Sequence, residues 1–586
     1  MGKSFILNKK TYINLNSIKV LFFIFLLAVN CNLNSQTLVL ADDGQSKYKI
    51  IVALNADKNE IFAASEFQRY FENITGIKLA VEKNKGFENK YSIFVGNRNR
   101  FENIPSVEDD GVILQTKESN LIISGGKNRG VLYSVYSFFE NYLDCEFFAL
   151  DEIKIPKKRS VSIPQLNYIY SPVFNFRSYY SLENSNKAYA DFHKQNYFFE
   201  NRLYPAHSLA WLLPAEKYFK THPEYFALID GKRNPSQICF SSEGALNELL
   251  KVLKHEMEVT PNEVWSVSHL DSPNYCHCNI CENKYKRGNG FSETLIPFVN
   301  KVAKAFPDKT ISTLAYNQSL LPSKFELPAK NVEIMFCFTN VDRRYAINSD
   351  KNKEAKRFID ALQDWKKQTS NIFIWDYNVN YFHSLFPFPN LNTLKQNITY
   401  FKNTGAKKVF IEGIGPQQGE FSELKSYVAS KLLWNPNADY DLLMNEFLMN
   451  YYGEAWKDIK QYIQTLEVNV QKYNNPLDVY ANPVQYKNGY LSEQNILIYK
   501  NILEKALDKV KTKPQYINRI KKEMLSIEYA ELEIYSNAVN ARSDKSSNEK
   551  FNRKLNSFKQ EAKKLNITYL RNAEFTVDEF IKTKSR

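Results

Sequence analysis

The sequence predicts an α/β protein built on a (β/α)8 TIM barrel, with a small α/β domain before the barrel and an all-helical region after it. Between residues 170 and 436, short apolar runs alternate with helical stretches, which is typical of parallel βα units. About eight such runs occur, as a closed barrel of this kind requires. After the Asn-Pro pair at 435–436, apolar residues recur at intervals of three and four, which indicates helices. A chain of 586 residues is also too long for a single core.

The first 36 residues have the pattern of a signal peptide. Lysines at positions 3, 9, 10 and 19 precede an apolar run at 20–29, which is too short to span a bilayer comfortably. Cleavage near residues 34–36 would release the mature protein. A lipid anchor at Cys31 is the alternative, although Asn30 is larger than the residue such sites prefer. We therefore expect an exported protein that is periplasmic, associated with the outer membrane or secreted.

The net charge of +13 does not indicate a nucleic-acid-binding protein. The excess comes from single lysines spread over the chain, without an arginine-rich patch or a basic helix face. No segment after the leader is long and apolar enough to cross a membrane, and no G-x-G-x-x-G or Walker pattern marks a nucleotide site. We expect a solvated surface and a carbohydrate partner.

The small α/β domain is predicted over residues 37–165. Its expected strands are 48–53, 91–96, 154–156 and 161–164, with a hairpin formed by 111–116 and 121–126. Two amphipathic helices are expected at 59–73 and 129–143, because their apolar residues fall on one side.

The barrel is predicted over residues 170–436. Its expected strands are 174–180, 198–202, 225–229, 264–268, 311–316, 332–338, 372–375 and 408–411, of which the second and third have the weakest patterns. The helical region, residues 437–586, is expected to contain helices at 440–452, 454–473, 492–512, 515–541 and 548–565.

Acidic residues follow three of the predicted barrel strands. Asp271 comes after the fourth strand, Asp376 after the seventh and Glu412 after the eighth. Because barrel chemistry takes place at the carboxyl ends of the strands, we expect these acids to converge. A protonated carboxyl can donate to a leaving oxygen while an ionised one activates water or attacks the anomeric carbon, so the pattern predicts glycoside hydrolysis without a cofactor.

Other polar and aromatic residues near the strand ends are candidates for substrate binding. Trp and Tyr rings suit stacking on sugar CH faces, and a guanidinium suits a substrate carboxylate, for which Arg343, Arg344 or Arg177 are candidates. The predicted substrate-binding residues are His207, Trp211, His269, Asn317, Arg343, Trp375 and Tyr377. Glu423 is expected to begin a helix, and the role of Glu420 is left open.

Four cysteines form a candidate structural metal site. Cys276, Cys278 and Cys281 have C-x-C-x-x-C spacing, and Cys239 can supply a fourth thiolate. Four thiolates are typical of a closed structural zinc site without an open position for water. A disulfide, which export would permit, and a site that includes His277 are the alternatives.

Many motifs of the chain, in order, resemble the domain-of-unknown-function family numbered 4838. The resemblance rests on His207, His222-Pro-Glu-Tyr-Phe-Ala-Leu, Gly231-Lys-Arg, Gln237-Ile-Cys-Phe, Val267-Ser-His-Leu-Asp, Tyr275-Cys-His-Cys-Asn-Ile-Cys, Ile374-Trp-Asp-Tyr, Pro387-Phe-Pro-Asn-Leu, Leu424-Lys-Ser-Tyr-Val-Ala-Ser-Lys-Leu-Leu-Trp-Asn-Pro, Glu446-Phe and Tyr451-Tyr-Gly. The first domain resembles the non-catalytic α/β domain that precedes the barrel in α-glucuronidases and β-hexosaminidases.

The resemblance implies a barrel like that of glycoside hydrolases. By similarity to the inverting α-glucuronidases, Asp376 and Glu412 would match the pair on the water side, and Asp271 would occupy the place of the acid, where those enzymes have Glu. Ser272 follows Asp271, so the adjacent Asp-Glu of β-hexosaminidases is missing. The sequence thus predicts an exported glycoside hydrolase acting on a polysaccharide or oligosaccharide, with uronic-acid-bearing glycans as candidate substrates. A non-catalytic carbohydrate-binding or scaffold protein on the same barrel is the alternative.

Overall fold

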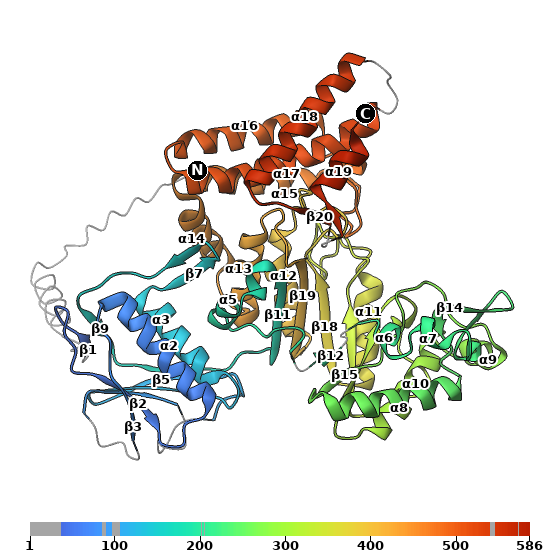
Figure 1. The fold of residues 1–586 in the computed structure, drawn as a ribbon, viewed down its shortest axis with the longest axis horizontal. Helices are drawn as coiled ribbons and strands as arrows, with labels where there is room; N and C mark the ends of the chain where they lie inside the picture. Colours follow the sequence, from blue (N-terminus) through green and yellow to red (C-terminus); the bar gives the residue numbers. More distant parts are fainter. Residues whose placement is uncertain are drawn as a thin grey trace, which may run out of the picture.

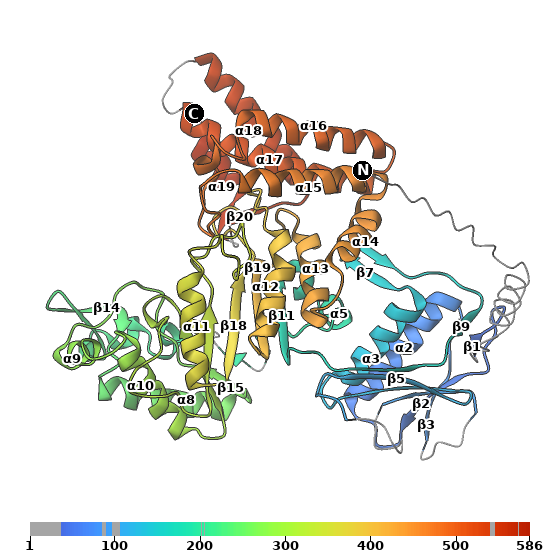
Figure 2. The same ribbon diagram turned by 180° about the vertical axis from the view of Figure 1, so that it is seen from behind.

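The computed structural model describes residues 37–84, 90–96, 106–200, 202–203, 206–539, 545–571 and 574–585. The predicted leader and Cys31 lie outside these residues. Figures 1 and 2 show an amino-terminal α/β part, a central parallel sheet with its helices, and a carboxy-terminal helical part above the sheet. Among the helices in the described ranges, none is both long and apolar enough to cross a bilayer.

The amino-terminal part has a six-stranded mixed sheet in the order β10-β5-β6-β4-β2-β3, on which α2 and α3 pack against each other. The predicted hairpin and both predicted helices are confirmed, because their apolar faces meet in one core. The elements are β1 Leu38–Ala41, β2 Lys49–Ala53, α2 Lys58–Thr75, β3 Val81–Asn84, β4 Ser92–Val95, β5 Val112–Lys117, β6 Asn120–Gly125, α3 Gly130–Leu143, β7 Glu146–Ala149, β8 Glu152–Lys154, β9 Val161–Ile163 and β10 Asn167–Tyr170.

The central sheet has seven parallel strands in the order β12-β15-β16-β17-β18-β19-β11. This is the neighbour order of a (β/α)8 barrel from which the third strand is missing, and no described residues of β11 and β12 pair to close it. The strands are β11 Phe176–Ser181, β12 Arg202–Leu203, β15 Val264–Ser266, β16 Thr310–Ala315, β17 Val332–Cys337, β18 Ile372–Tyr377 and β19 Lys408–Gly415.

Helices cover the outer face of this sheet, where they bury the apolar side chains of alternate strand residues. They are α8 Glu243–Val259, α10 Ser292–Ala305, α11 Lys356–Gln368, α12 Leu391–Asn403 and α13 Ser422–Trp434. The α/β class and the parallel sheet are thus confirmed, whereas a full eight-stranded barrel is not.

The prediction that residues 225–229 form the third barrel strand is wrong. Phe226–Ile229 forms β13, which pairs antiparallel with β14, Lys232–Ile238, outside the parallel sheet. This hairpin belongs to an insertion that projects to one side in Figure 1, together with α6 Leu209–Leu212, α7 Ala215–Tyr218 and α9 Asn279–Tyr285.

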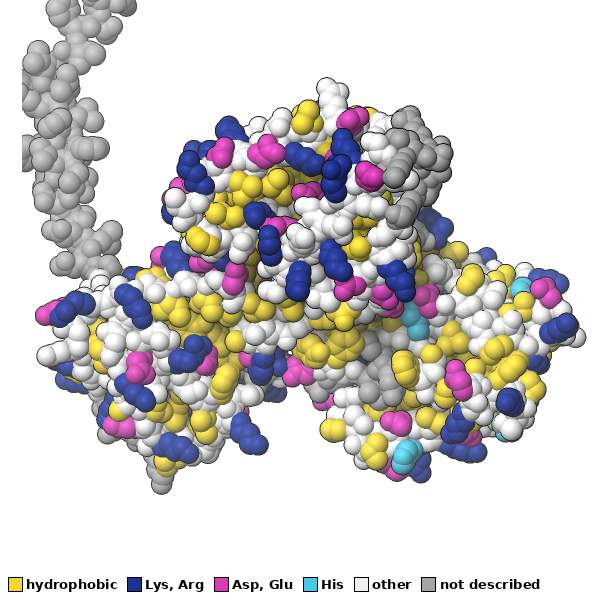
Figure 3. Space-filling model, turned by 45° about the horizontal axis from the view of Figure 1, so that its top comes forward, with side chains coloured by type: hydrophobic (Ala, Val, Ile, Leu, Met, Phe, Trp, Pro, Cys, Tyr) yellow, Lys and Arg dark blue, Asp and Glu magenta, His cyan; other side chains and the backbone are white. Residues whose placement is uncertain are grey.

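The carboxy-terminal part is mostly helical, as predicted, and adds a small hairpin that was not predicted. Its elements are α14 Tyr440–Tyr452, α15 Trp456–Gln471, α16 Glu493–Val510, α17 Pro514–Val539, α18 Lys545–Lys564, β20 Tyr569–Arg571, β21 Phe575–Thr576 and α19 Val577–Lys584. The hairpin is held next to the carboxyl ends of the central strands, because the Ser384 N–H donates to the Leu570 carbonyl at 2.9 Å. On the face drawn in Figure 3, basic and acidic side chains are interspersed over this part.

A buried ion cluster fills the interior of the central sheet near the amino ends of its strands. Glu333 accepts from Arg202 at 2.8 Å and from Lys408 at 2.6 Å, and the Ser312 hydroxyl also donates to it at 2.9 Å. Burial alone would raise the pKa of Glu333, but the two cations lower it to about 2. Further along the strands the interior is apolar, with Phe198, Leu314, Met335, Cys337, Phe373, Tyr377 and Phe410.

We predict that Glu333→Gln lowers the free energy of unfolding by about 3–5 kcal/mol, because it leaves two buried cations without a counter-charge. Urea denaturation of the two proteins measures the difference. Asp360→Asn is the matched control, because its pair with Lys356 at 2.7 Å is exposed and contributes at most about 1 kcal/mol. Since the pKa of Glu333 is lowered, its contribution is present above pH 4–5 and is lost as the pH falls toward about 2. A loss no larger than that of the control would contradict the prediction.

Candidate active site

A cavity of about 470 Å³ opens at the carboxyl ends of the central strands. Its walls come from the strands, from the insertion and from the carboxy-terminal part. It is lined by Ala206, His207, Asp271, Leu314, Tyr316, Cys337, Thr339, Trp375, Tyr377, Tyr381, Phe382, Glu412, Tyr480, Arg571 and Glu574. Two of the three predicted catalytic acids, Asp271 and Glu412, therefore share one cavity.

Glu412 lies on β19, on the interior face of the sheet. Its Oε2 accepts hydrogen bonds from the Tyr381 hydroxyl at 2.7 Å and from Trp375 Nε1 at 2.9 Å. Burial raises the pKa of Glu412 to about 7, even though both donors favour the charged form. Because Oε2 is occupied by donors, Oε1 is the oxygen that can carry a proton. Such a carboxyl is suited to general acid catalysis near neutral pH.

Asp271 lies on an exposed loop beyond β15. Its Oδ1 accepts from the Tyr316 hydroxyl at 3.3 Å. The loop is held on one side by Gln237, whose side chain donates to the Leu270 carbonyl at 3.2 Å and accepts from the Leu270 N–H at 3.1 Å. On the other side, the Gln318 side chain donates to the Ser272 carbonyl. An exposed carboxylate held in this way is available to a ligand in the cavity.

Aromatic rings form much of the cavity wall. Trp375 and Tyr377 are stacked with ring centroids 6.1 Å apart, and Tyr381 stacks on Tyr480 at 5.4 Å. Burial raises the pKa of Tyr480, and the nearby charges of Asp271 and Glu412 raise it further. Tyr480 lines the same cavity as both acids.

The third predicted acid, Asp376, does not reach the cavity. It sits between Trp375 and Tyr377 on β18, and because side chains alternate along a strand, it points to the opposite face. There it accepts from Arg343 at 2.6 Å and from Asn397 of α12 at 3.4 Å. Its position does not support the predicted catalytic role.

The three arginines considered for a substrate carboxylate are already paired. Arg343 is buried against Asp376, Arg344 binds Asp342 at 2.6 Å, and Arg177 binds Asp110 at 2.7 Å. None of the three lines the cavity. The predicted role of Arg343 in substrate binding therefore has no support from its position.

The two histidines predicted to bind substrate, His207 and His269, differ in their position relative to the cavity. His207 lines the cavity, and its Nδ1 donates to the His269 carbonyl at 2.9 Å. His269 is fully buried behind it, with Nε2 at 3.0 Å from the Ser319 hydroxyl. Burial lowers the pKa of His269 to about 4, so that it is neutral at physiological pH. His269 supports the cavity wall and does not line it.

Of the remaining predicted residues, Trp375 and Tyr377 line the cavity, whereas Trp211 and Asn317 do not. Trp211 is 66% exposed on α6, and Asn317 is exposed where a short 3-10 turn, Asn317–Ser319, begins. The sequence analysis missed Tyr381, five residues beyond Asp376, and it assigned no chemistry to the carboxy-terminal part that supplies Tyr480, Arg571 and Glu574.

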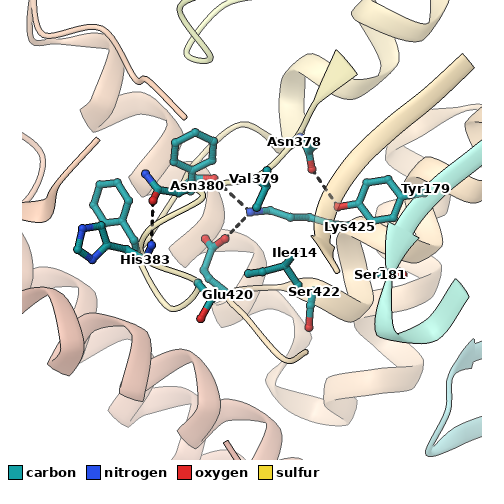
Figure 4. Close-up of a pocket in the computed structure, with 13 residues that line it drawn as sticks. Tyr179, Ser181, Asn378, Val379, Asn380, His383, Ile414, Glu420, Ser422 and Lys425 are labelled. Atoms are coloured by element: carbon teal, nitrogen blue, oxygen red, sulfur yellow. Dashed lines mark hydrogen bonds and ion pairs between the residues drawn. The ribbon is translucent and has the colours of Figure 1, made fainter. Parts of the chain in front are cut away.

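A second, smaller cavity beside the site has a volume of only about 20 Å³. Figure 4 shows Lys425 paired with Glu420 at its centre, at 2.5 Å, and the Tyr179 hydroxyl donating to Asn378 at 3.2 Å. This volume admits about one water molecule, so the cavity cannot hold a sugar. Glu420 is therefore part of a buried ion pair and not of the candidate site.

The four predicted cysteines are brought together in the insertion. Their Sγ atoms all lie within 4.8 Å of one another, and Cys239 Sγ is 3.9 Å from the Sγ atoms of Cys278 and Cys281. A disulfide requires about 2.05 Å, and the six described cysteines are all free. A tetrahedral zinc with Zn–S bonds of about 2.3 Å separates its sulfurs by about 3.8 Å. The cluster fits a tetrathiolate zinc site.

Two family models match the chain. The model described as "Domain of unknown function (DUF4838)" matches residues 147–464, and the model described as "Glycosyl hydrolase family 67 N-terminus" matches residues 36–138. These matches confirm the resemblances found in the sequence motifs. The comparison with curated proteins found no match.

Among solved structures, the chain is similar to a family GH115 4-O-methyl-α-glucuronidase with specificity for decorated arabinogalactans. The identity is 12% and the TM-score 0.55, over 92% of this chain and 78% of that one. Weaker similarities are to a GH138 enzyme targeting pectin rhamnogalacturonan II (10% identity, TM-score 0.42, 92% and 98% covered) and to a β-N-acetylhexosaminidase from Bacteroides fragilis (12%, 0.42, 73% and 94%). The first similarity shows a shared fold over most of both chains.

Proposed function

The chain belongs to the DUF4838 family, and from its cavity we propose that the protein is an exported glycoside hydrolase acting on a polysaccharide or oligosaccharide. The observation that carries the proposal is that two carboxyls line one aromatic-walled cavity. Glu412 is buried and has a pKa raised to about 7, and Asp271 is exposed. The GH115 enzyme is a 4-O-methyl-α-glucuronidase with specificity for decorated arabinogalactans, and this activity supports the choice of reaction. Export and the lipid-anchor alternative at Cys31 remain proposals from the sequence.

In the proposed mechanism, Glu412 is the general acid and Asp271 the base or nucleophile. The protonated Oε1 of Glu412 donates to the glycosidic oxygen as the bond to the anomeric carbon breaks. The ionised Asp271 either takes a proton from an attacking water or attacks the anomeric carbon itself. Burial of one carboxyl and exposure of the other separate the two roles, and they reverse the assignment that strand order suggested.

We predict that Glu412→Gln and Asp271→Asn each lower kcat/KM by about 100- to 10,000-fold on whichever substrate the parent hydrolyses, because each removes one proton-transfer or attacking group. A panel of aryl glycosides and plant glycans identifies the substrate. Asp360→Asn, on the exposed face of α11, should leave the rate unchanged. If the parent binds glycans without hydrolysing any of them, the protein is instead a carbohydrate-binding protein.

We also predict that kcat/KM falls as the pH rises through about 7, because Glu412 then loses its proton. Tyr381→Phe removes a donor that stabilises the ionised carboxylate, so the pKa of Glu412 rises and the alkaline limb moves to higher pH. Tyr316→Phe is the control, because its hydroxyl donates to Asp271 and the alkaline limb should stay in place. An identical shift in both variants would argue against Glu412 as the acid.

We further propose that Cys239, Cys276, Cys278 and Cys281 hold a structural zinc ion and that catalysis requires no cofactor. Four thiolates leave no coordination position for water, so the ion would hold the insertion together and take no part in the reaction.

We predict about one zinc per chain by metal analysis of the purified protein, because four converging thiolates form a complete tetrahedral site. Cys281→Ser should release the metal and lower the thermal midpoint, whereas Cys145→Ser, a buried cysteine outside the cluster, should retain the metal. Metal-free protein with fewer free thiols than cysteines on denaturation would support a disulfide instead.

A further inference from the structure

Arg571 is half-buried and differs in its partners from the buried arginines of the described residues. Each of those has an acidic partner: Arg177 with Asp110, Arg202 with Glu333, Arg343 with Asp376, Arg344 with Asp342 and Arg519 with Asp151. Within the described residues, no acidic side chain lies within ion-pair distance of the Arg571 guanidinium. Its Nε is buried and has no hydrogen-bond partner.

Arg571 stands where two cavities meet. It lines the active-site cavity and also a neighbouring cavity of about 450 Å³ that lies between α17, α19 and the β20–β21 hairpin. Phe382 lines both cavities as well. The guanidinium is therefore within reach of a ligand in either cavity.

The guanidinium is held in place by aromatic rings and not by charge. Its central carbon lies 4.9 Å from the centroid of the Phe382 ring and 5.7 Å from that of Phe575. The strand that carries it is fixed to the loop after β18 by the Ser384–Leu570 hydrogen bond. The side chain thus presents a planar set of donors, of which Nε has no partner, and such a set matches an oxyanion.

The neighbouring acidic residues do not form an ion pair with Arg571. Glu533, in the second cavity, is paired with Lys584 at 2.8 Å. Glu574 is exposed and lines the active-site cavity, but it makes no ion pair with Arg571. The charge of Arg571 is therefore left for a ligand.

We propose that Arg571 binds an anionic substituent, a carboxylate or a sulfate, of the sugar that occupies the active-site cavity, and so selects acidic glycans. This proposal rests on the proposed function for the identity of the ligand as a glycan. It gives the carboxy-terminal part a role in specificity.

The test is the binding of methyl glucuronoside, glucose 6-sulfate and methyl glucoside, measured by NMR titration at constant pH. The parent should bind at least one of the two anionic sugars about tenfold more tightly than the neutral one, because a guanidinium adds a charge-assisted hydrogen bond. Arg571→Gln should remove this preference, and Arg571→Lys should keep part of it, since the charge remains and the planar fork is lost. The preference of the parent should also shrink at high salt.

Arg287→Gln is the matched control, because Arg287 stacks on Phe325 at 5.5 Å in the same manner but is exposed and lines neither cavity. Equal affinity of the parent for anionic and neutral sugars would overturn the proposal, as would an equal loss for both in Arg571→Gln. Circular dichroism checks the fold of each variant.

Two outcomes separate this inference from the proposed function. A parent that prefers acidic sugars but hydrolyses none would refute the proposed activity and leave this inference standing. Hydrolysis of neutral glycans without any acidic preference would support the activity and overturn this inference.

Discussion

Side chains on a strand alternate between two faces, and in the central sheet this alternation decides which residues can meet a ligand. Along β18, Trp375 and Tyr377 face the cavity, while Asp376 between them faces α12. Along β19, Glu412 lies on the interior face, two residues after Phe410. The apolar side chains of the outer face, which include Ile374 and Ile411, pack under helices. They fix the register of the strands, because a shift by one residue would turn these side chains into the cavity. The position of the site residues on the inner face thus depends on the packing of the outer face, which contributes no residue to the site.

The sequence predicts the later strands of the sheet well, because they are buried on both faces and read as continuous apolar runs. Residues 225–229 have the same composition but form a hairpin, and composition alone cannot separate the two cases. The distinguishing signal was in the next two residues. Asp230 and Gly231 have φ angles of 48° and 75°, which a two-residue type I′ turn between antiparallel strands requires, and Asp-Gly is a preferred pair for it.

The site was only partly predictable for a related reason. An acid near the end of a strand can lie on either face, so Asp376 and Glu412 were indistinguishable until the register was known. Asp376 and Arg343 were both assigned to the site, and the structure pairs them with each other on its outer side. Tyr480 comes from an irregular segment and Arg571 from the end of the short strand β20, and neither has a local sequence pattern that places it at the cavity, because both reach it only through the packing of the carboxy-terminal part.

The two acids of the site are held by different means, and the hairpin found in place of the third barrel strand supports one of them. Glu412 belongs to a strand with neighbours on both sides, so its backbone is fixed by the sheet. Asp271 is on an exposed loop. Gln318 holds one side of this loop, and the hairpin in place of the third strand supplies further supports: Gln237 holds Leu270, and Cys239, directly after β14, converges with Cys276. A base or nucleophile has to be held within a fraction of an ångström of its working position. In the proposed mechanism, the cysteine cluster would therefore help to position Asp271 by fixing the far end of its loop.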